Sequence, residues 1–523
     1  MQATEEQVNI NALVSARKNV VVDAGAGSGK SSTLRYIAQQ NPELNFLVLC
    51  FNTANAKESN EHVERPSNIF YSTLHSIAYR EVVDAKMRKK LQPYLNYLDI
   101  DSNVLTRAGF CDSAMDAEEE KRILILLRRG IQNCITYYCR SDSSSLLDFA
   151  VKMFEYWFTN DVIEESDEDV ANIPTKSVAL TTEQQYELAI ITRKYWLTLI
   201  DVGSSYSITH DVYLKLYQLR DCRISYFYDK DSKQEVALNC LCLDEAQDTN
   251  PVAQSIFDNS GLQKVIVGDR YQQLYAWRGA TNIMADYPHF PKGTLTTSFR
   301  FNQQIADMAN VVLHIAGSGM QLIGAGRQTT INTKAHLCRT NLSVVSRIFA
   351  NISYDPEVMI NTNIDFKEVI SKLYHINAVS FNEKPKFPNK SLKDITDKKS
   401  LEEAIAMSDD LKQLVRLSVL LTKSSEGGLT TAINTMKNHI VNDGSGSITI
   451  STIHKSKGLS YSSVTIDDDI VPVKLDSEGN YIKLEEALEA FWGDISLNCL
   501  LYVAITRTEV ECNLPKILLP YFT

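Results

Sequence analysis

Residues 20–34 read VVVDAGAGSGKSSTL, and this stretch decides the fold of the chain. Three valines form a short apolar strand, a glycine-rich turn follows, and the lysine and hydroxyl residues after the turn open a helix. The spacing Ala24-x4-Gly29-Lys30-Ser31 matches a P-loop, with alanine in place of the first glycine of the pattern. We predict a phosphate-binding loop between strand and helix, in preference to an ordinary glycine-rich turn.

The predicted loop has a defined chemistry. Backbone N–H groups of such a turn, together with the N-terminus of the following helix, point at the oxygens of a phosphate chain. Lys30 would reach the β- and γ-phosphate oxygens, and the Ser31 hydroxyl would bind Mg²⁺. The ligand class predicted from this stretch is therefore a nucleoside triphosphate with a divalent cation.

Length and composition place the chain among ordinary globular proteins. It has 523 residues, of which 44% are hydrophobic and 22% charged, so it is neither disordered nor dominated by membrane-spanning segments. At about 150 residues per domain, we expect three to four domains' worth of structure. No eighteen-residue apolar window and no signal pattern at the N-terminus are present. We expect no membrane association and a cytoplasmic location, or a nuclear one in a eukaryotic host.

Charge and cysteine usage restrict the possible partners and metals. The net charge of −11 argues against coating nucleic acid by bulk electrostatics, so any such contact requires a specific track of residues with base stacking. The ten cysteines contain no CxxC pair, which excludes zinc-ribbon and iron–sulfur spacing. We expect reduced thiols that pack in the core.

Two carboxylates mark the end of a further predicted strand. The segment 237–250, ALNCLCLDEAQDTN, is mostly apolar up to Asp244 and Glu245. Adjacent carboxylates at the edge of a buried strand are costly unless a cation or a reaction uses them. Downstream of a P-loop, Asp244 would hold Mg²⁺, and Glu245 would orient or deprotonate water.

The strand pattern predicts an α/β fold with two parallel sheets, each interrupted by an insertion. Apolar runs at 45–51 and 262–268 join the strands already named around the P-loop. Helical periodicity dominates from about 80 to 200, and a second α/β section begins at about 293. The predicted boundaries are 1–80 and 201–280 for the first α/β domain, 81–200 for a largely helical insertion, 281–345 and 441–523 for the second α/β domain, and 346–440 for a small, less regular insertion.

Eight stretches, in this order, resemble the UvrD/Rep/PcrA group of superfamily 1 DNA helicases over nearly the whole chain. They are Gln7, AGAGSGKSS, CFNTANAKE, STLHS, LDEAQD, VGDRYQQLYAWRGA, TTSFR with LCRTN, and TIHKSKGL with YVAITR. Within the group, ITHDVYLKLYQL (208–219) and LTTSFRF (295–301) are most similar to the F-box DNA helicase, although we expect no F-box here. The resemblance implies two RecA-like P-loop domains, 1A and 2A, with ATP between them, and insertion domains 1B and 2B.

The resemblance also implies which residues bind and hydrolyse ATP. Gln7 would read adenine, and Phe299 would stack on it where the family more often has tyrosine. Asp244 would complete the Mg²⁺ shell through water, with Ser31, and Glu245 would be the general base. The remaining implied ATP-site residues are the loop Ala24, Gly25, Ala26, Gly27, Ser28, Gly29, Lys30 and Ser32, the γ-phosphate sensor Gln272, the arginine fingers Arg300 and Arg507, and Gly458.

The DNA contacts implied by the resemblance combine stacking with backbone contacts. Phe51, Tyr275 and Trp277 would stack on bases of a single strand, each stack contributing ~1–3 kcal/mol. Tyr275 and Trp277 are alternatively core aromatics, and His75 a capping or solvent-facing residue. The backbone or flanking positions would be held by Asn52, Thr73, His75, Arg278, Arg339, Asn341, Thr452, His454 and Lys455.

Some features depart from the family pattern or fall outside it. Ser460 occupies a position where the family usually has a glutamate that touches the nucleotide sugar, which bears on nucleotide affinity or sugar discrimination. Thr508 replaces a common alanine and is expected to have a mild effect. The lysine-rich segment 384–400 is either a solvated face or a duplex-contacting surface of 2B, and the acidic segment 164–169 is expected to be a solvated loop.

Two functions remain open from the sequence. The first is an ATP-dependent single-stranded DNA translocase and 3′→5′ helicase acting in DNA repair, recombination or replication, as a monomer, on single strands and single/double-strand junctions. The second is an ATP-gated subunit of a larger DNA-processing or defence assembly with a nuclease partner. Both use ATP and Mg²⁺, and the sequence identifies no particular protein partner.

Overall fold

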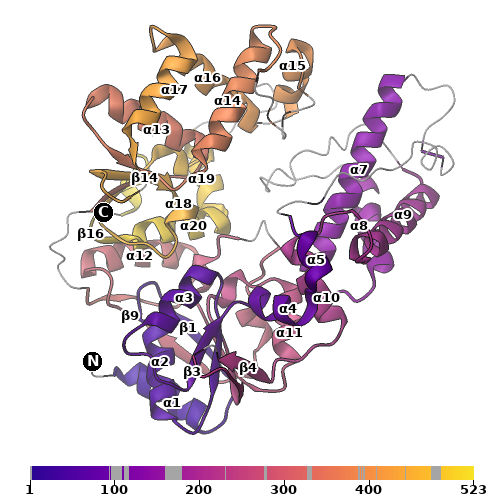
Figure 1. The fold of residues 1–523 in the computed structure, drawn as a ribbon. Coiled ribbons are helices and arrows are strands. Elements are labelled where there is room, and N and C mark those ends of the chain that lie inside the picture. Colours follow the sequence, from indigo (N-terminus) through magenta and orange to yellow (C-terminus); the bar gives the residue numbers. More distant parts are fainter. Residues whose placement is uncertain are drawn as a thin grey trace. The chain divides into compact units, whose positions relative to one another are not determined.

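A computed structural model describes residues 3–92, 95, 109–110, 117–159, 180–229, 231–275, 279–326, 333–386, 389, 392, 395–407, 409–441, 443–472 and 484–522. These residues form two compact units (Figure 1). The first unit comprises Met1–Ala24, Lys30–Arg270 and Tyr275–Leu295, and the second comprises Gly25–Gly29, Tyr271–Leu274 and Thr296–Thr523.

The first unit is built on a six-stranded sheet with the order β3-β2-β6-β7-β1-β8 in the described part of the chain. Every neighbouring pair in this sheet is parallel. The predicted α/β class is therefore observed. The strands are β1 (Val20–Ala24), β2 (Phe46–Leu49), β3 (Ile69–Ser72), β6 (Cys240–Leu243), β7 (Gln263–Gly268) and β8 (Lys292–Leu295).

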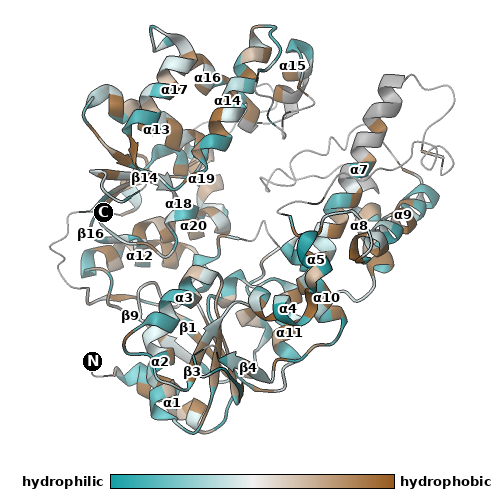
Figure 2. Ribbon diagram, in the orientation of Figure 1, coloured by the Kyte–Doolittle hydropathy of each residue, from teal (hydrophilic) through white to brown (hydrophobic). Residues whose placement is uncertain are grey.

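Alternate residues of these strands enter two different cores, because successive side chains of a strand point to opposite faces of the sheet. In β2, Phe46 and Val48 join one core, whereas Leu47 and Leu49 join the other. The strands carry hydrophobic residues, while α3 is largely hydrophilic (Figure 2). Helices α1 (Glu5–Ser15), α2 (Lys30–Gln40) and α3 (Thr53–Glu61) contribute to the first core, and α4 (Leu74–Val82), α10 (His210–Leu219) and α11 (Pro251–Asp258) to the second.

The segment between α4 and α10 is helical, as its periodicity predicts. Its described elements are α5 (Ala85–Lys89), α7 (Ala117–Arg140), α8 (Leu146–Thr159) and α9 (Thr182–Ile200). Buried residues of α7, α8 and α9 belong to the same core as one face of the sheet. A hairpin of β4 (Tyr226–Asp229) and β5 (Gln234–Ala237) precedes β6. The acidic segment 164–169 lies outside the described residues.

The second unit contains another six-stranded parallel sheet among its described residues, with the order β13-β12-β14-β11-β15-β16. A short parallel pair, β9 (Thr297–Ser298) and β10 (Ile323–Gly324), precedes it. The strands of the larger sheet are β11 (Lys334–Cys338), β12 (Ile360–Asn361), β13 (Ile440–Val441), β14 (Ile448–Thr452), β15 (Tyr461–Ile466) and β16 (Thr508–Asn513).

Helices of the second unit follow its strands or lie between them. One of them, α20, is buried along most of its length because it is apolar on every face. The helices are α12 (Gln303–Ile315), α13 (Asn341–Tyr354), α14 (Phe366–Ser380), α15 (Lys398–Met407), α16 (Asp409–Lys423), α17 (Gly428–His439), α18 (Ile453–Ser456), α19 (Leu484–Gly493) and α20 (Ile495–Thr506).

Two expected boundaries differ from the structure. The first domain extends to Leu295 and not to residue 280, because β8 pairs with β1 in the first sheet. The segment 346–440 is mainly helical and not irregular, since α13 to α17 occupy most of it. It also contains β12 of the second sheet, and its helices share one core with residues of β11, β12 and β14. The expected insertion domain 346–440 therefore stays a prediction, since its helices and the sheet belong to one compact unit.

The cysteines were expected to be reduced thiols that pack in the core. The nine cysteines in the described part of the chain are free, and seven of them are buried.

Among the described residues, no single helix has the length and apolar composition to cross a membrane. The bent pair α19 and α20, which meet at 86°, meets that criterion by length and composition only.

Candidate nucleotide and nucleic-acid site

Predicted site residues of the first unit gather at one edge of its sheet. All neighbouring strands are parallel, so their carboxyl ends lie at the same edge, which is where open α/β sheets bind ligands. The sheet thereby brings together segments that are up to about 240 residues apart in sequence. The residues that follow the strand ends are Lys30 after β1, Phe51 and Asn52 after β2, Thr73 and His75 after β3, Asp244 and Glu245 after β6, and Asp269 after β7.

An ion pair joins the two residues predicted to act at the γ-phosphate end of the site. Lys30 is the first residue of α2, and its Nζ lies 3.0 Å from Oε1 of Glu245. Burial alone would lower the pKa of Lys30, but the carboxylates of Glu245, Asp244 and Asp269 outweigh burial and raise it. Lys30 is therefore held as a cation among three carboxylates, as a phosphate-binding lysine requires.

Glu245 is fixed by its backbone and by a residue that sequence reasoning missed. Its φ of 55° lies in the left-handed region, which is uncommon for a residue with a side chain. Gln247 donates from Nε2 to Oε2 of Glu245 at 2.6 Å and accepts the N–H of Asp269 at its Oε1 at 3.0 Å. The Gln247 side chain is fully buried. The sequence carries no local signal for this role, because the contact with Asp269 spans 22 residues.

The P-loop has the backbone and side-chain features that a phosphate chain needs. Gly27 and Gly29 have φ values of 71° and 83°, which a residue with a side chain rarely adopts. The Oγ of Ser28 is buried and has no hydrogen-bond partner among the described residues. A phosphate oxygen would satisfy that hydroxyl, and Asp244 and Ser31 supply the oxygen ligands that Mg²⁺ prefers. The residues present therefore fit a triphosphate with Mg²⁺.

The N-terminal glutamine already uses both ends of its amide. Gln7 belongs to a capping box at the start of α1, where its Oε1 accepts the N–H of Thr4 at 3.1 Å. Its Nε2 donates to the Oγ1 of Thr33, in α2, at 3.0 Å. The two bonds fix the amide relative to α2. Among the described residues, these bonds leave one amide hydrogen and one oxygen lone pair of Gln7 for adenine, so the predicted contact stays a prediction.

In the second unit, the Arg507 side chain is buried and hydrogen-bonded to several acceptors. Its side chain is 1% exposed. Its guanidinium donates to the carbonyl oxygens of Val503 at 3.2 Å and Leu459 at 3.3 Å, and to Oε1 of Gln272 at 3.3 Å. Lys457 donates from Nζ to the carbonyl oxygen of Gln272 at 2.9 Å. The predicted γ-phosphate sensor and one predicted arginine finger are thus directly bonded.

The other predicted residues of the second unit surround the loop 25–29, which groups with it. The N–H of Ala26 donates to the Tyr502 hydroxyl at 3.2 Å, and the N–H of Phe299 donates to the carbonyl oxygen of Gly27 at 2.9 Å. Phe299 is 39% exposed, which leaves its ring available for stacking. Arg300 donates to the carbonyl oxygen of Thr506 at 3.1 Å.

Two further predicted positions lie after α18. Gly458 has a φ of 90° and open space where a Cβ would lie. Ser460 is exposed. Serine has no carboxylate with which to contact the nucleotide sugar. The expected effect on nucleotide affinity or sugar discrimination stays a prediction.

The first unit presents an aromatic pair among its predicted DNA contacts. The rings of Phe51 and Tyr275 are stacked, with centroids 5.0 Å apart and planes 18° apart. Phe51 is 43% exposed, and Tyr275 is half-buried. Trp277 and Arg278 lie outside the described residues. The pair offers an aromatic surface of the kind on which single-stranded bases stack.

Three neighbouring predicted contacts lie at helix starts. Asn52 caps α3 by accepting the N–H of Asn55 at 2.8 Å, and Thr73 caps α4 by accepting the N–H of Ser76 at 3.1 Å. His75, in the first turn of α4, is bound to the carboxylate of Asp211. The caps fix the starts of α3 and α4, so Asn52, Thr73 and His75 are held at defined positions after the strand ends.

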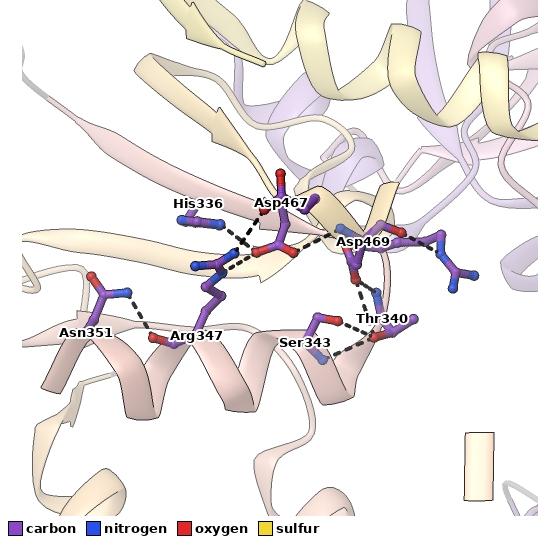
Figure 3. Close-up of polar contacts among 9 residues, drawn as sticks. His336, Thr340, Ser343, Arg347, Asn351, Asp467 and Asp469 are labelled. Carbon is purple, nitrogen blue, oxygen red and sulfur yellow. Dashed lines mark hydrogen bonds and ion pairs between the residues drawn. The ribbon is translucent and has the colours of Figure 1, made fainter. Parts of the chain in front are cut away.

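In the second unit, the segment from Arg339 to Asn341 is held by the carboxylate of Asp469. Figure 3 shows this carboxylate beside Thr340. Asp469 accepts the N–H groups of Arg339 at 2.8 Å and Thr340 at 3.0 Å, and its carbonyl oxygen accepts Nε of Arg339 at 3.0 Å. Asn341 is exposed at the first position of α13. A fixed backbone therefore presents Arg339 and Asn341, and sequence reasoning did not single out Asp469.

The remaining predicted DNA contacts lie at the start of α18. Thr452 caps this helix by accepting the N–H of Lys455 at 3.3 Å. The Lys455 side chain is exposed, and His454 is half-buried. Asn363 donates to the carbonyl oxygen of Lys455 at 3.1 Å and fixes the turn. A cation at a short, fixed helix start suits a backbone phosphate better than a base edge.

A nearby group of metal-ligating side chains is occupied by a protein cation. His336, Cys338 and Asp467 place one ligand atom each within 4.8 Å of one another. Asp467 accepts Nε2 of His336 at 2.9 Å and also Nε of Arg347 (Figure 3). Burial opposes the Asp467 charge, but His336, the Asp469 backbone N–H and Arg347 outweigh burial and lower its pKa to about 2. The guanidinium already neutralises this carboxylate, so the group is a structural charge cluster.

Comparison with known proteins gives the family. A model of the UvrD/REP helicase N-terminal domain matches residues 4–291, more than half of the chain. The chain belongs to the UvrD/Rep helicase family. This confirms the family predicted from the eight stretches, and the two parallel sheets agree with two RecA-like domains.

The relatives include the subgroup expected from the local segments. F-box DNA helicase 1 of Gallus gallus is 25% identical over 530 residues, covering 97% of this chain and 48% of the relative. F-box DNA helicase protein 1 of Schizosaccharomyces pombe is 24% identical over 554 residues, covering 97% of this chain and 58% of the relative. The ATP-dependent DNA helicase PcrA of Leuconostoc citreum is 35% identical over 82 residues, 14% of this chain and 11% of the relative. This UvrD/Rep member thus spans about half the length of the F-box helicases that it matches.

Proposed function

We propose that this chain is an ATP-dependent translocase on single-stranded DNA and a 3′→5′ DNA helicase, acting in repair, recombination or replication. The observation that carries the proposal is the ion pair of Lys30 with Glu245 at the sheet edge that also presents Phe51 and His75. The residues for ATP hydrolysis and those for DNA contact then lie at the same edge of one sheet. Family membership and the helicase names of the relatives support it.

The chain's own residues divide the hydrolysis chemistry among them. Lys30, which pairs with Glu245, would hold the terminal phosphate oxygens, and the buried Ser28 hydroxyl would donate to a phosphate oxygen. Mg²⁺, held by Ser31 and through water by Asp244, would neutralise phosphate charge. Glu245 accepts a proton from the attacking water, while Gln247 keeps its carboxylate in one orientation.

The link from hydrolysis to strand movement runs through the segment after β7. Gln272 senses the terminal phosphate and is bonded to Arg507. Three residues later, Tyr275 is stacked on Phe51. A shift of Gln272 on hydrolysis therefore reaches an aromatic contact over a very short stretch of chain. Alternate tightening and release of that contact would advance the strand.

ATP hydrolysis with and without a single-stranded oligonucleotide tests the proposal. We expect strong stimulation by DNA, lost in Lys30→Ala and in Glu245→Gln, and retained in the control Lys57→Ala, whose side chain is 75% exposed. Strand displacement on duplexes with a 3′ or a 5′ tail tests direction, and displacement only from the 3′ tail is expected. Absence of DNA stimulation in the unmodified protein would refute the proposal.

A mass measurement separates the proposal from an assembly subunit. Full unwinding by a monomer supports the helicase that acts alone. Unwinding that appears only in a complex with a nuclease would favour the alternative function.

A further inference from the structure

Asp211 joins two basic side chains that come from different helices. It lies at the second position of α10, and its Oδ1 is 3.5 Å from Nε2 of His75 in α4. Its Oδ2 accepts Nε of Arg140, the last residue of α7, at 3.2 Å. Burial opposes the charge on Asp211, but His75 and Arg140 outweigh burial and lower its pKa. The carboxylate is therefore charged at neutral pH and orients both partners.

Arg140 keeps most of its hydrogen-bonding capacity. A guanidinium has five N–H donors in a planar fork, and Asp211 takes only the one on Nε among the described residues. The Arg140 side chain is 24% exposed. Since Asp211 fixes the inner edge of the fork, the two terminal NH₂ groups are presented in one orientation. Such a fork matches the geometry of a phosphate group.

The position of Arg140 extends a row of predicted strand contacts. The ends of β2 and β3 are adjacent, because the N–H of Cys50 donates to the carbonyl oxygen of Ser72 at 2.9 Å. Phe51 therefore follows one strand end and His75 follows its neighbour. Arg140 continues from His75 through their shared carboxylate.

A second contact places Arg140 beside the segment after the aromatic pair. A Cβ built on Gly279 would lie 3.9 Å from Cβ of Arg140. Gly279 is four residues after Tyr275, whose ring stacks on Phe51. The end of α7 thus meets both segments from which we predict strand contacts in this unit. A helix of the insertion contributes a cation to the sheet edge.

We propose that Arg140 binds a backbone phosphate of single-stranded DNA beside the stacked bases, and that Asp211 is a positioning residue that orients Arg140 and His75 for this contact. This inference rests on the proposed function. It assigns the end of α7 to the strand-binding surface of the first unit. The contact reads no base, so it is independent of sequence.

The test measures binding of a fluorescent oligothymidine across a salt series. Each lost phosphate contact lowers the slope of log affinity against log salt by ~0.7 for single strands. We expect Arg140→Gln to reduce the slope by that amount and to weaken binding about tenfold at low salt, as expected for one charge-assisted hydrogen bond. Arg140→Lys, which keeps the charge, is expected to restore the slope and most of the affinity.

Arg65→Gln is the matched control. Arg65 pairs with Asp231 at 3.5 Å in the same unit, but it precedes β3 and so lies toward the opposite edge of the sheet. We expect its salt slope to equal that of the unmodified protein. Equal melting temperatures of the Arg140 variants and the control show that the fold is retained.

Asp211→Asn tests the positioning role. It removes the charge that orients the guanidinium but leaves Arg140 in place, so we expect weaker binding with the slope nearly kept. Combined with Arg140→Gln, it should add only the loss that comes through His75, so the double variant should lose less affinity than the sum of the two single losses. Additive losses would contradict a shared role.

The results separate this inference from the function beneath it. If the unmodified protein neither binds the oligonucleotide nor hydrolyses ATP faster with it, the proposed function fails. If the unmodified protein does both, and Arg140→Gln has the same slope and affinity within twofold, only the inference is overturned. A weaker Arg140→Gln with an unchanged slope also overturns it, since a structural role alone produces that result.

Discussion

Replacing Gln247 by leucine is expected to weaken both the fold and ATP hydrolysis. The Gln247 amide is buried and connects the Glu245 carboxylate, at 2.6 Å, to the N–H of Asp269, at 3.0 Å. Leucine has a similar size but neither donor nor acceptor. The variant removes the acceptor that Gln247 gives the Asp269 N–H. It also removes one of the contacts that orient the Glu245 carboxylate, whose other oxygen stays paired with Lys30.

The magnitude follows from the two bonds. A hydrogen bond to a charged group contributes ~1.5–3 kcal/mol, and a buried N–H left unpaired costs ~1–3 kcal/mol. Because both changes occur at one residue and do not simply add, we expect about 3 kcal/mol of lost stability. For a unit of this size, that lowers the melting temperature by roughly 6–12 °C. A catalytic group displaced by about 1 Å loses roughly 100-fold in rate, so kcat should fall by ~10- to 100-fold.

The assay combines thermal melting with steady-state ATP hydrolysis at saturating single-stranded DNA. Gln254→Leu is the matched control, because Gln254 also donates to a carboxylate, that of Asp286 at 2.9 Å, but does so at an exposed position. Gln247→Glu keeps an acceptor for Asp269 but buries a second carboxylate against Glu245, so it should impair hydrolysis and lower the melting temperature as well. Affinity for DNA should stay unchanged in all three.

The reasoning fails if Gln247→Leu melts within 2 °C of the unmodified protein and hydrolyses ATP within twofold of its rate. It also fails if Gln254→Leu shows the same losses, since burial would then be irrelevant.

Three further changes have expected outcomes. Lys215→Met should lower the melting temperature of the first unit, because the fully buried Nζ serves two backbone carbonyls whose loss costs ~2–4 kcal/mol. Asp467 has a folded pKa of about 2, below its unfolded value of 3.8. Its charge therefore stabilises the fold by about 2 kcal/mol above pH ~4, and this stabilisation is lost as pH falls toward 2. In urea unfolding, Asp467→Asn should be less stable than the unmodified protein at pH ~7 and equally stable near pH ~2, where the pair with Arg347 is lost. Phe51→Ala should weaken single-strand binding about tenfold by anisotropy and leave Tyr275 without its stacking partner, in line with ~1–3 kcal/mol per stacked base.

Several features of the site could be predicted because their signals are local. The P-loop signals are neighbours in sequence: the valines before the loop, the glycines with positive φ and the lysine at the helix start. Few other residues adopt that backbone or carry that charge, so the pattern is specific. The apolar run ending at Asp244 and Glu245 likewise predicts a strand whose carboxyl end carries charge, and β6 ends at Leu243. Local sequence therefore determined the P-loop, the strands around it and the family.

The domain limits were harder to predict from sequence, because strand pairing within the sheets determines them. A four-residue strand such as β8 has too short a pattern to assign, and only its pairing with β1 places it in the first sheet. The helices between α13 and α17 share a core with strands of the second sheet, a fact that helical periodicity alone does not give.

The supporting residues were decided by tertiary structure alone. Gln247 meets Asp269 across 22 residues, Arg140 meets Asp211 across 71, and Thr340 meets Asp469 across 129. A buried amide or carboxylate looks the same in sequence whichever partner it finds, because hydrogen bonds act over about 3 Å and chain folding sets those distances. The sequence by itself determined the phosphate loop and its family; the folded chain decided which neighbours hold Glu245, His75 and Arg339 in position.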